Sequence, residues 1–176
     1  FTTRKLANRY DISILGVDYA QKMIDAANSC TNNKNNNANI KFNVQDCTNL
    51  IIKDDSFDIV YTERCIQNLP NIQLQEKGVR ELIRVLKPGG KLLLIECSKN
   101  GLNKLNRVRE YIGRQPIKDA EPWHNKFLDD DWIIDFVNAN EHTKTIKINH
   151  FSSTYTFLTR VLPFWRLFYY SKWFYH

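Results

Sequence analysis

Residues Ser56–Ser98 read SFDIVYTERCIQNLPNIQLQEKGVRELIRVLKPGGKLLLIECS, and the spacing of their apolar side chains changes twice. The run Phe57–Tyr61 is rich in β-branched and aromatic residues, which predicts a strand buried on both faces. Apolar residues then recur every three or four positions over Val79–Leu86, which predicts an amphipathic helix that Pro88–Gly90 ends. The apolar run Leu92–Ile95 predicts a second buried strand. Two such strands joined by a helix form a right-handed parallel crossover, so the stretch predicts an α/β fold.

Similar signals lie upstream, in ILGVDYAQKMIDAA (Ile14–Ala27) and NVQDCTNL (Asn43–Leu50). With the FDIV strand, the RVLKPGG turn and the KLLLIE strand, these segments resemble class I S-adenosylmethionine-dependent methyltransferases, in particular their small-molecule group. The resemblance covers the chain from Ile12 to Ser98. It implies a Rossmann-like fold, in which helices flank a mostly parallel central sheet, and S-adenosylmethionine as the cofactor.

In this family a first strand ends in a glycine-rich loop, and that segment is expected directly before Phe1. No G-x-G-x-G occurs in the 176 residues. Two interpretations stay open: the sequence is an N-terminally truncated fragment, or it is a degenerate protein without a working cofactor site. The start at Phe1 favours truncation. We expect residues 1–176 to form a single incomplete domain that is inactive as it stands.

By the resemblance, Asp18 follows the strand Ile12–Val17 and is the anchor of the cofactor's ribose, because a carboxylate accepts hydrogen bonds from both hydroxyls. The alternative is an N-cap for the helix that begins near Gln21. Tyr19 is expected to lie against the adenine ring, with a hydrophobic staple at the helix entry as the alternative.

Asp46 follows the next predicted strand, Ile40–Gln45. It resembles the residue that accepts from the adenine amino group, and the backbone amide of Cys47 is expected to meet a ring nitrogen. The alternative for Asp46 is a simple Asx turn.

The loop Thr62–Asn71 leaves the carboxyl end of the FDIV strand, where open α/β sheets place their ligands. Thr62 is predicted to contact the cofactor near the sulfonium. Glu63 is predicted to be catalytic, by offsetting the positive charge or orienting the acceptor, and Arg64 to bind an anionic acceptor. The alternative for both is a surface ion pair of little consequence.

Two further candidates lie in AEPWHNKFLDDDW, which resembles an acceptor-side loop of some methyltransferases. His124 is the predicted general base, because imidazole titrates near neutral pH, and Trp123 is the predicted substrate contact. The alternative is a structural histidine packed beside the tryptophan.

Residues 99–142 are predicted to supply acceptor-side helices and a loop, including a short helix Asp130–Asn138. Thr143–Phe151 alternates polar and apolar residues and predicts the next strand. A further C-terminal strand cannot be placed in the aromatic and basic tail Arg160–His176. That tail either binds a membrane surface, which suits a lipid-linked acceptor, or packs on the acceptor pocket.

The composition of the chain limits the classes of partner and cofactor that are expected. The net charge is +6, but the basic residues are spread along the chain, so nucleic acid is not the expected acceptor. The four cysteines lack metal-ligand spacing, and no metal site is predicted. Without a leader pattern or a long apolar run, a cytoplasmic location is expected. The sequence makes no prediction of oligomeric state.

Two functional hypotheses follow. The first is methyl transfer from S-adenosylmethionine to a small-molecule, sugar or lipid-linked acceptor. The second is a non-catalytic domain that keeps the fold as a binding or scaffolding module. Asp18 and Asp46 favour the first, because a scaffold has no need of acids at both adenosine-binding turns.

Overall fold

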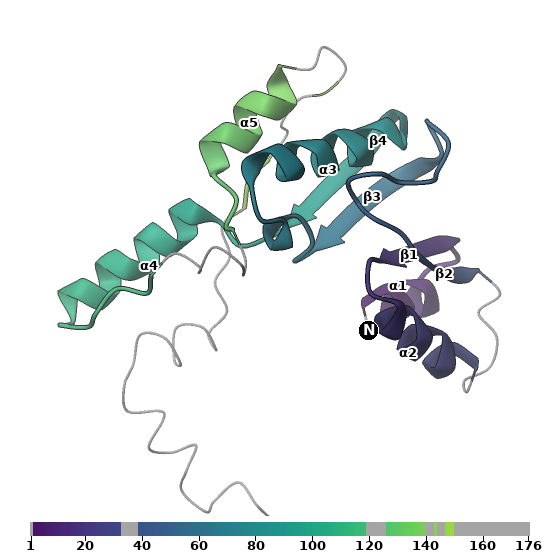
Figure 1. Ribbon diagram of the computed structural model, residues 1–176, viewed down its shortest axis with the longest axis horizontal. Helices are drawn as coiled ribbons and strands as arrows, with labels where there is room; N and C mark the ends of the chain where they lie inside the picture. Colours follow the sequence, from purple (N-terminus) through teal and green to yellow (C-terminus); the bar gives the residue numbers. More distant parts are fainter. Residues whose placement is uncertain (1, 33–38, 119–125, 140–142, 144–146, 150–176) are drawn as a thin grey trace, which may run out of the picture. The chain divides into compact units, whose positions relative to one another are not determined.

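The computed structural model describes residues 2–32, 39–118, 126–139, 143 and 147–149 (Figure 1). The chain divides into two compact units, one of Phe1–Tyr61 with Asn71–Leu94 and the other of Thr62–Pro70 with Ile95–His176. The elements in chain order are α1 (Thr2–Arg9), β1 (Ile14–Asp18), α2 (Gln21–Asn32), β2 (Ile40–Val44), β3 (Phe57–Glu63), the 3-10 turn η1 (Ile66–Asn68), α3 (Ile72–Arg84), β4 (Leu86–Ile95), α4 (Lys99–Tyr111) and α5 (Asp130–Asn138).

The first unit contains a parallel two-stranded sheet, β1–β2, with a register that runs from the Ile14–Ile40 pair to the Asp18–Val44 pair. Parallel strands need a crossover connection, and α2 supplies it with Ile24 buried on its inner face. Because the strands are parallel and in register, the turns that follow them begin at the same edge of the sheet.

A second two-stranded sheet pairs β3 with β4. The two arrows point the same way in Figure 1, and α3 runs beside them. Asn71 caps α3 by accepting a hydrogen bond from the Leu74 amide at 2.9 Å, and Val79 and Leu82 are buried on its inner face. This strand–helix–strand order confirms the predicted α/β fold.

The predicted end of the α3 helix was wrong. The helix ends at Arg84, and Pro88–Gly90 lie within β4 instead of between helix and strand. The physical reason is the Val85 carbonyl, which accepts the amides of Ser56 at 2.9 Å and Phe57 at 3.0 Å. The backbone at Val85 therefore pairs with the start of β3 instead of continuing the helix.

Two glycines suit this part of β4. Gly89 has a φ of +78°, which favours glycine. A Cβ on Gly90 would lie 2.9 Å from the Lys87 carbonyl oxygen and 3.0 Å from that of Asp58, so a side chain would displace backbone. The two glycines of the PGG sequence are therefore required by the backbone conformation of β4 at this point.

The prediction that both strands are buried on both faces was also wrong. Burial alternates along β4: Leu92 and Leu94 are half-buried, whereas Leu93 is 46% and Ile95 37% exposed. Ile59 on β3 is 60% exposed. An uninterrupted apolar run places apolar side chains on both faces of a strand. In the β3–β4 sheet, however, one face is more exposed than the other.

The second unit brings the starts of α4 and α5 together. Ser98 forms a parallel bridge with Leu128, and its hydroxyl donates to Asp130 at 2.7 Å. The same Ser98 Oγ accepts from the Gly101 amide at 2.9 Å and caps α4. Asp129 caps α5, whose bounds match the predicted helix Asp130–Asn138.

Most residues of the predicted C-terminal segments lie outside the described part of the chain. In the predicted strand Thr143–Phe151, the described residues 143 and 147–149 are not part of a strand. The tail Arg160–His176 lies outside the described residues. Among the helices that the structure does describe, none has the length and apolar character needed to cross a membrane.

Candidate functional site

Asp18 is the last residue of β1 and is exposed. Its Oδ1 accepts from the Ala20 amide at 2.8 Å, a local turn that leads into α2. Its Oδ2 makes no hydrogen bond to another described residue. This turn precedes α2 and is not the N-cap of the alternative interpretation, because α2 begins at Gln21 and Asp18 accepts from Ala20 instead of from an amide of the first helical turn. The carboxylate keeps Oδ2 for a ligand. Tyr19 follows with 79% exposure.

Asp46 stands two residues beyond the end of β2, also exposed. Its Oδ1 accepts both the amide and the hydroxyl of Thr48 at 2.8 Å, so the Asx-turn alternative is present as local structure. The amide of Gln45 donates to the Asp18 carbonyl at 3.0 Å, which ties this turn to the end of β1. Cys47, inside the turn, is half-buried.

These two carboxylates suit the adenosine part of the expected cofactor. Ribose hydroxyls and the adenine amino group donate hydrogen bonds, and an ionised carboxylate is a pure acceptor. Asp18 and Asp46 are exposed at one edge of a parallel sheet, and each already uses only Oδ1 locally. The residues present therefore fit the group they were predicted to hold.

An ion-paired clamp on α3, which was not predicted from the sequence, holds the loop that follows Asp46. Glu81 accepts the Leu50 amide at 2.8 Å. Arg84 donates to the carbonyls of Leu50 at 3.0 Å and Ile52 at 2.7 Å, and to the Asp54 carboxylate at 2.6 Å. Residues 50–54 are thereby fixed against α3.

The two clamp residues also bind each other. Arg84 donates from Nε to Glu81 Oε1 at 2.8 Å and from Nη2 to Oε2 at 2.7 Å, a bidentate pair. This hydrogen bonding lowers the pKa of Glu81 and, with Asp54, raises the pKa of Arg84. Both residues are polar positions between the apolar ones of α3, and no local spacing indicates their partners in the loop, which lie more than 25 residues away in the sequence.

In the second unit, Glu96 organises the turn after β3, here named the Thr62–Gln67 turn. Its Oε1 accepts the Thr62 hydroxyl at 2.6 Å and the amides of Cys65 at 3.0 Å and Ile66 at 3.2 Å. Its Oε2 accepts the Gln67 amide at 3.2 Å. A single carboxylate thus fixes four donors. In the sequence, Glu96 stands at the end of the KLLLIE run, and an acid that closes an apolar run is a usable signal for such a role.

The three predicted site residues on this turn differ in their surroundings. Thr62 is 5% exposed and its hydroxyl is engaged by Glu96. Glu63 and Arg64 are exposed. Arg64 has a φ of +55°, which is uncommon for a side-chain-bearing residue, and its carbonyl accepts from Asn68 at 2.7 Å. Strained backbone of this kind is concentrated at functional sites.

Gln67 was not among the predicted residues. It is fully buried, and its Oε1 accepts the Cys97 amide at 2.7 Å. Its Nε2 has no hydrogen-bond partner among the residues that the structure describes. A buried unpaired donor costs about 1–3 kcal/mol, so it needs a physical explanation, and one is a ligand oxygen.

Trp123 and His124 lie outside the described residues. Within the described parts of the chain, no cluster of three or more histidine, cysteine, aspartate or glutamate side chains has the arrangement of a metal site.

Comparison with known proteins gives a family match. The family described as "Methyltransferase domain" matches residues 1–94. Phosphoethanolamine N-methyltransferase 2 of Caenorhabditis elegans is 25% identical over 112 residues, which cover 64% of this chain and 25% of that protein. Norajmaline N-methyltransferase of Rauvolfia serpentina is 30% identical over 98 residues, covering 56% and 32%. Demethylmenaquinone methyltransferase of Lactobacillus johnsonii is 33% identical over 87 residues, covering 49% and 34%. The matched region thus spans between a quarter and about a third of the length of these relatives.

Solved structures share the fold. The YcgJ protein from Bacillus subtilis has 26% identity and a TM-score of 0.54, covering 72% of this chain and 51% of that one. A Methanosarcina mazei S-adenosylmethionine-dependent methyltransferase has 23% identity and a TM-score of 0.53, covering 72% and 68%. The predicted Rossmann-like fold is confirmed by these neighbours.

Proposed function

This chain belongs to the methyltransferase-domain family, whose cofactor is S-adenosylmethionine, and we propose that it methylates a small-molecule, sugar or lipid-linked acceptor in the cytoplasm. The observation that carries the proposal is the pair Asp18 and Asp46, two exposed carboxylates at the carboxyl edge of the β1–β2 sheet. Ligands of open α/β sheets bind at such an edge.

In the first unit, Asp18 accepts hydrogen bonds from the ribose hydroxyls through Oδ2, while Oδ1 keeps the Ala20 amide. Asp46 accepts from the adenine amino group in the same manner. Tyr19 covers one face of the adenine, and the backbone of Cys47 meets its edge. The clamp by Glu81 and Arg84 stiffens the loop that follows the Asp46 turn.

In the second unit, the Thr62–Gln67 turn supplies the groups that face the acceptor. The bound cofactor supplies a methyl carbon already activated by the sulfonium, so the chain's main task is alignment, with removal of a proton where the acceptor is a hydroxyl or amine. Glu63 orients the acceptor or takes that proton, and Arg64 pairs with an anionic group. The buried Nε2 of Gln67 is a further donor for an acceptor oxygen.

The class of acceptor is inferred from the names of the relatives. The names of the relatives describe methylation of phosphoethanolamine, norajmaline and demethylmenaquinone, three small molecules. We propose an acceptor of this range instead of nucleic acid. His124 as base, Trp123 as acceptor contact and the Arg160–His176 tail as a membrane contact complete the proposal.

Asp18→Ala, in the complete natural protein, is expected to weaken S-adenosylhomocysteine binding about 30-fold. Two hydrogen bonds to a charged acceptor are lost, together worth about 2 kcal/mol after solvent competition. Isothermal titration calorimetry measures the change. Asp18→Asn is the companion variant, because its amide oxygen retains the Ala20 turn while the charge is lost. Asp25→Ala, an exposed acid on α2, is the matched control. Unchanged affinity of Asp18→Ala would refute the ribose assignment.

Methyl transfer itself is expected in a screen with radiolabelled S-adenosylmethionine and three acceptors: phosphoethanolamine, a short-chain demethylmenaquinone and a cyclic secondary amine. With the best acceptor, Glu63→Gln is expected to lower kcat about 100-fold, the usual loss of a general base. Asp25→Asn, a change at an exposed acid on α2, serves as the comparison. Cofactor binding without transfer to any acceptor would favour the scaffold hypothesis instead.

A further inference from the structure

The outer face of α4 carries cations and apolar groups together. Lys104, Arg107, Val108 and Tyr111, here named the α4 face, are spaced at i, i+3, i+4 and i+7 and therefore form one stripe. Leu102 lies on the opposite side and is buried. Tyr111 is 92% and Val108 43% exposed. No side chain of the stripe forms a hydrogen bond or ion pair with the rest of the described chain.

The end of α4 is closed by backbone hydrogen bonds, so the exposed α4 face belongs to folded structure. The Gly113 amide donates to Glu110 at 2.9 Å and the Arg114 amide to Arg109 at 2.7 Å, which is the Schellman arrangement with Gly113 at a φ of +71°. Asn106 then exchanges two hydrogen bonds of 2.8 Å with the backbone of Ile117. The chain after the helix is thereby held on the Asn106 side, and the α4 face stays open.

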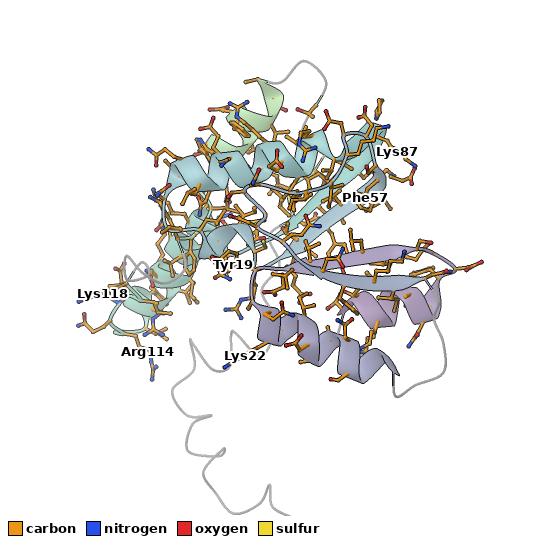
Figure 2. All side chains as sticks on the ribbon, turned by 45° about the vertical axis from the view of Figure 1, so that its right-hand side comes forward. Tyr19, Lys22, Phe57, Lys87, Arg114 and Lys118 are labelled. Atoms are coloured by element: carbon orange, nitrogen blue, oxygen red, sulfur yellow. The ribbon has the colours of Figure 1, made fainter. Side chains whose placement is uncertain are left out.

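The segment that follows α4, residues 112–118, adds positive charge. Figure 2 shows the side chains of Arg114 and Lys118 reaching outward from its end. Glu110 is the one acid between Lys99 and Lys118. The face therefore combines a positive field with exposed tyrosine and aliphatic surface.

We propose that the α4 face docks on an anionic phospholipid bilayer. Lysine and arginine near the surface pair with lipid phosphates, and an exposed tyrosine flanked by cations suits the headgroup region. Phosphate contact alone would explain the cations but would leave Tyr111, Val108 and the 40% exposed Ile112 without a role, which disfavours nucleic acid as the occupant. The proposal does not depend on the methyltransferase activity, and it rests on residues other than those of the Arg160–His176 tail.

The test is co-sedimentation of the complete protein with phosphatidylcholine vesicles that contain or lack phosphatidylglycerol. The double variant Lys104→Glu/Arg107→Glu is expected to lower binding to anionic vesicles by at least about 30-fold, because each basic residue near the surface contributes about a fivefold gain. Tyr111→Ser is expected to lower binding about fivefold, from lost apolar contact. The control Lys22→Glu/Lys41→Glu makes the same charge change at exposed positions of the first unit.

Binding that needs phosphatidylglycerol, falls with the α4 variants and survives in the control supports the proposal. Equal loss in the control would mean that net charge alone drives binding, and unchanged binding of the α4 variants would assign it to another segment; either result overturns the proposal. Failure of the unmodified protein to pellet with anionic vesicles also overturns the proposal. Retention of the protein on immobilised RNA, without pelleting with vesicles, overturns it too. Because all variants keep the tail and the Asp18 and Asp46 turns, cofactor affinity is a separate readout that reports on the proposed function.

Discussion

Replacing Glu96 by alanine is expected to lower the free energy of unfolding by about 3–5 kcal/mol. The carboxylate accepts four hydrogen bonds, from the Thr62 hydroxyl and from the amides of Cys65, Ile66 and Gln67. Alanine leaves these donors without their acceptor next to a buried turn, and each lost bond to a charged group costs about 1.5–3 kcal/mol before partial rescue by water. Few domains have a free energy of unfolding above about 15 kcal/mol, so the loss expected for Glu96→Ala is a large part of the total.

Urea denaturation measures this loss, and hydrogen exchange locates it. The amides of Cys65, Ile66 and Gln67 are expected to lose protection in Glu96→Ala more than amides of the first unit do. Glu96→Gln keeps the volume and one acceptor oxygen, so an intermediate loss is expected. Glu76→Gln is the control, because Glu76 pairs with Arg80 on the surface of α3 and such pairs contribute about 0.5 kcal/mol. A Glu96→Ala variant within 1 kcal/mol of the unmodified protein, on the scale of one ordinary hydrogen bond, would contradict the assignment.

The Thr62–Gln67 turn carries two residues of the proposed site. Glu63 and Arg64 are exposed on it, and Arg64 holds a φ of +55° that an isolated chain would rarely adopt. Glu96 binds the residues on both sides of this pair. Glu96 is therefore a positioning residue in the proposed function: it fixes the backbone from which the acceptor-facing groups project.

Local features of this chain were predictable from sequence. The α5 helix was predicted with its observed bounds because three acids, Asp129 to Asp131, mark its start and an apolar stripe follows. The Asx turn at Asp46 was predicted as an alternative to ligand binding, and it exists, because it needs only a contact two residues away. At Asp18 a turn of the same short range stands in place of the predicted N-cap. Interactions of short range can be read from spacing.

Interactions between distant segments were not predictable in the same way. The α3 helix was extended to Leu86 because its apolar period continues that far, yet the Val85 carbonyl is taken by residues nearly 30 positions earlier. Glu96 and Arg84 were missed for the same reason. Their partners lie about 30 residues away, and only the paired strands and the helix between them bring these segments together.

Arg84→Met is expected to lower the free energy of unfolding at neutral pH by about 3 kcal/mol. The guanidinium donates to Glu81, to Asp54 and to the carbonyls of Leu50 and Ile52, and methionine replaces only its hydrophobic stem. Arg84→Lys is expected to recover part of the loss, because one ammonium cannot reproduce the planar fork. Arg80→Met is the matched control: Arg80 lies four residues earlier on α3, is 65% exposed and pairs with Glu76, so a change of about 0.5 kcal/mol is expected.

The pH dependence distinguishes the clamp from simple packing. The bond from Arg84 is the main cause of the lowered pKa of Glu81, whose ordinary value is 4.5. Below that ordinary value the unfolded chain binds the proton first, so the stability contributed by this pair is complete above it and is lost as pH falls through the lowered folded pKa. Arg84→Met removes the main cause, and its stability should therefore decline less steeply on acidification than that of the unmodified protein. Parallel curves from pH 7 into this acid range would show that the stability lost in Arg84→Met does not come from the pair with Glu81. Converging curves, with early exchange of the Leu50 amide, would establish that charge holds the loop beside Asp46.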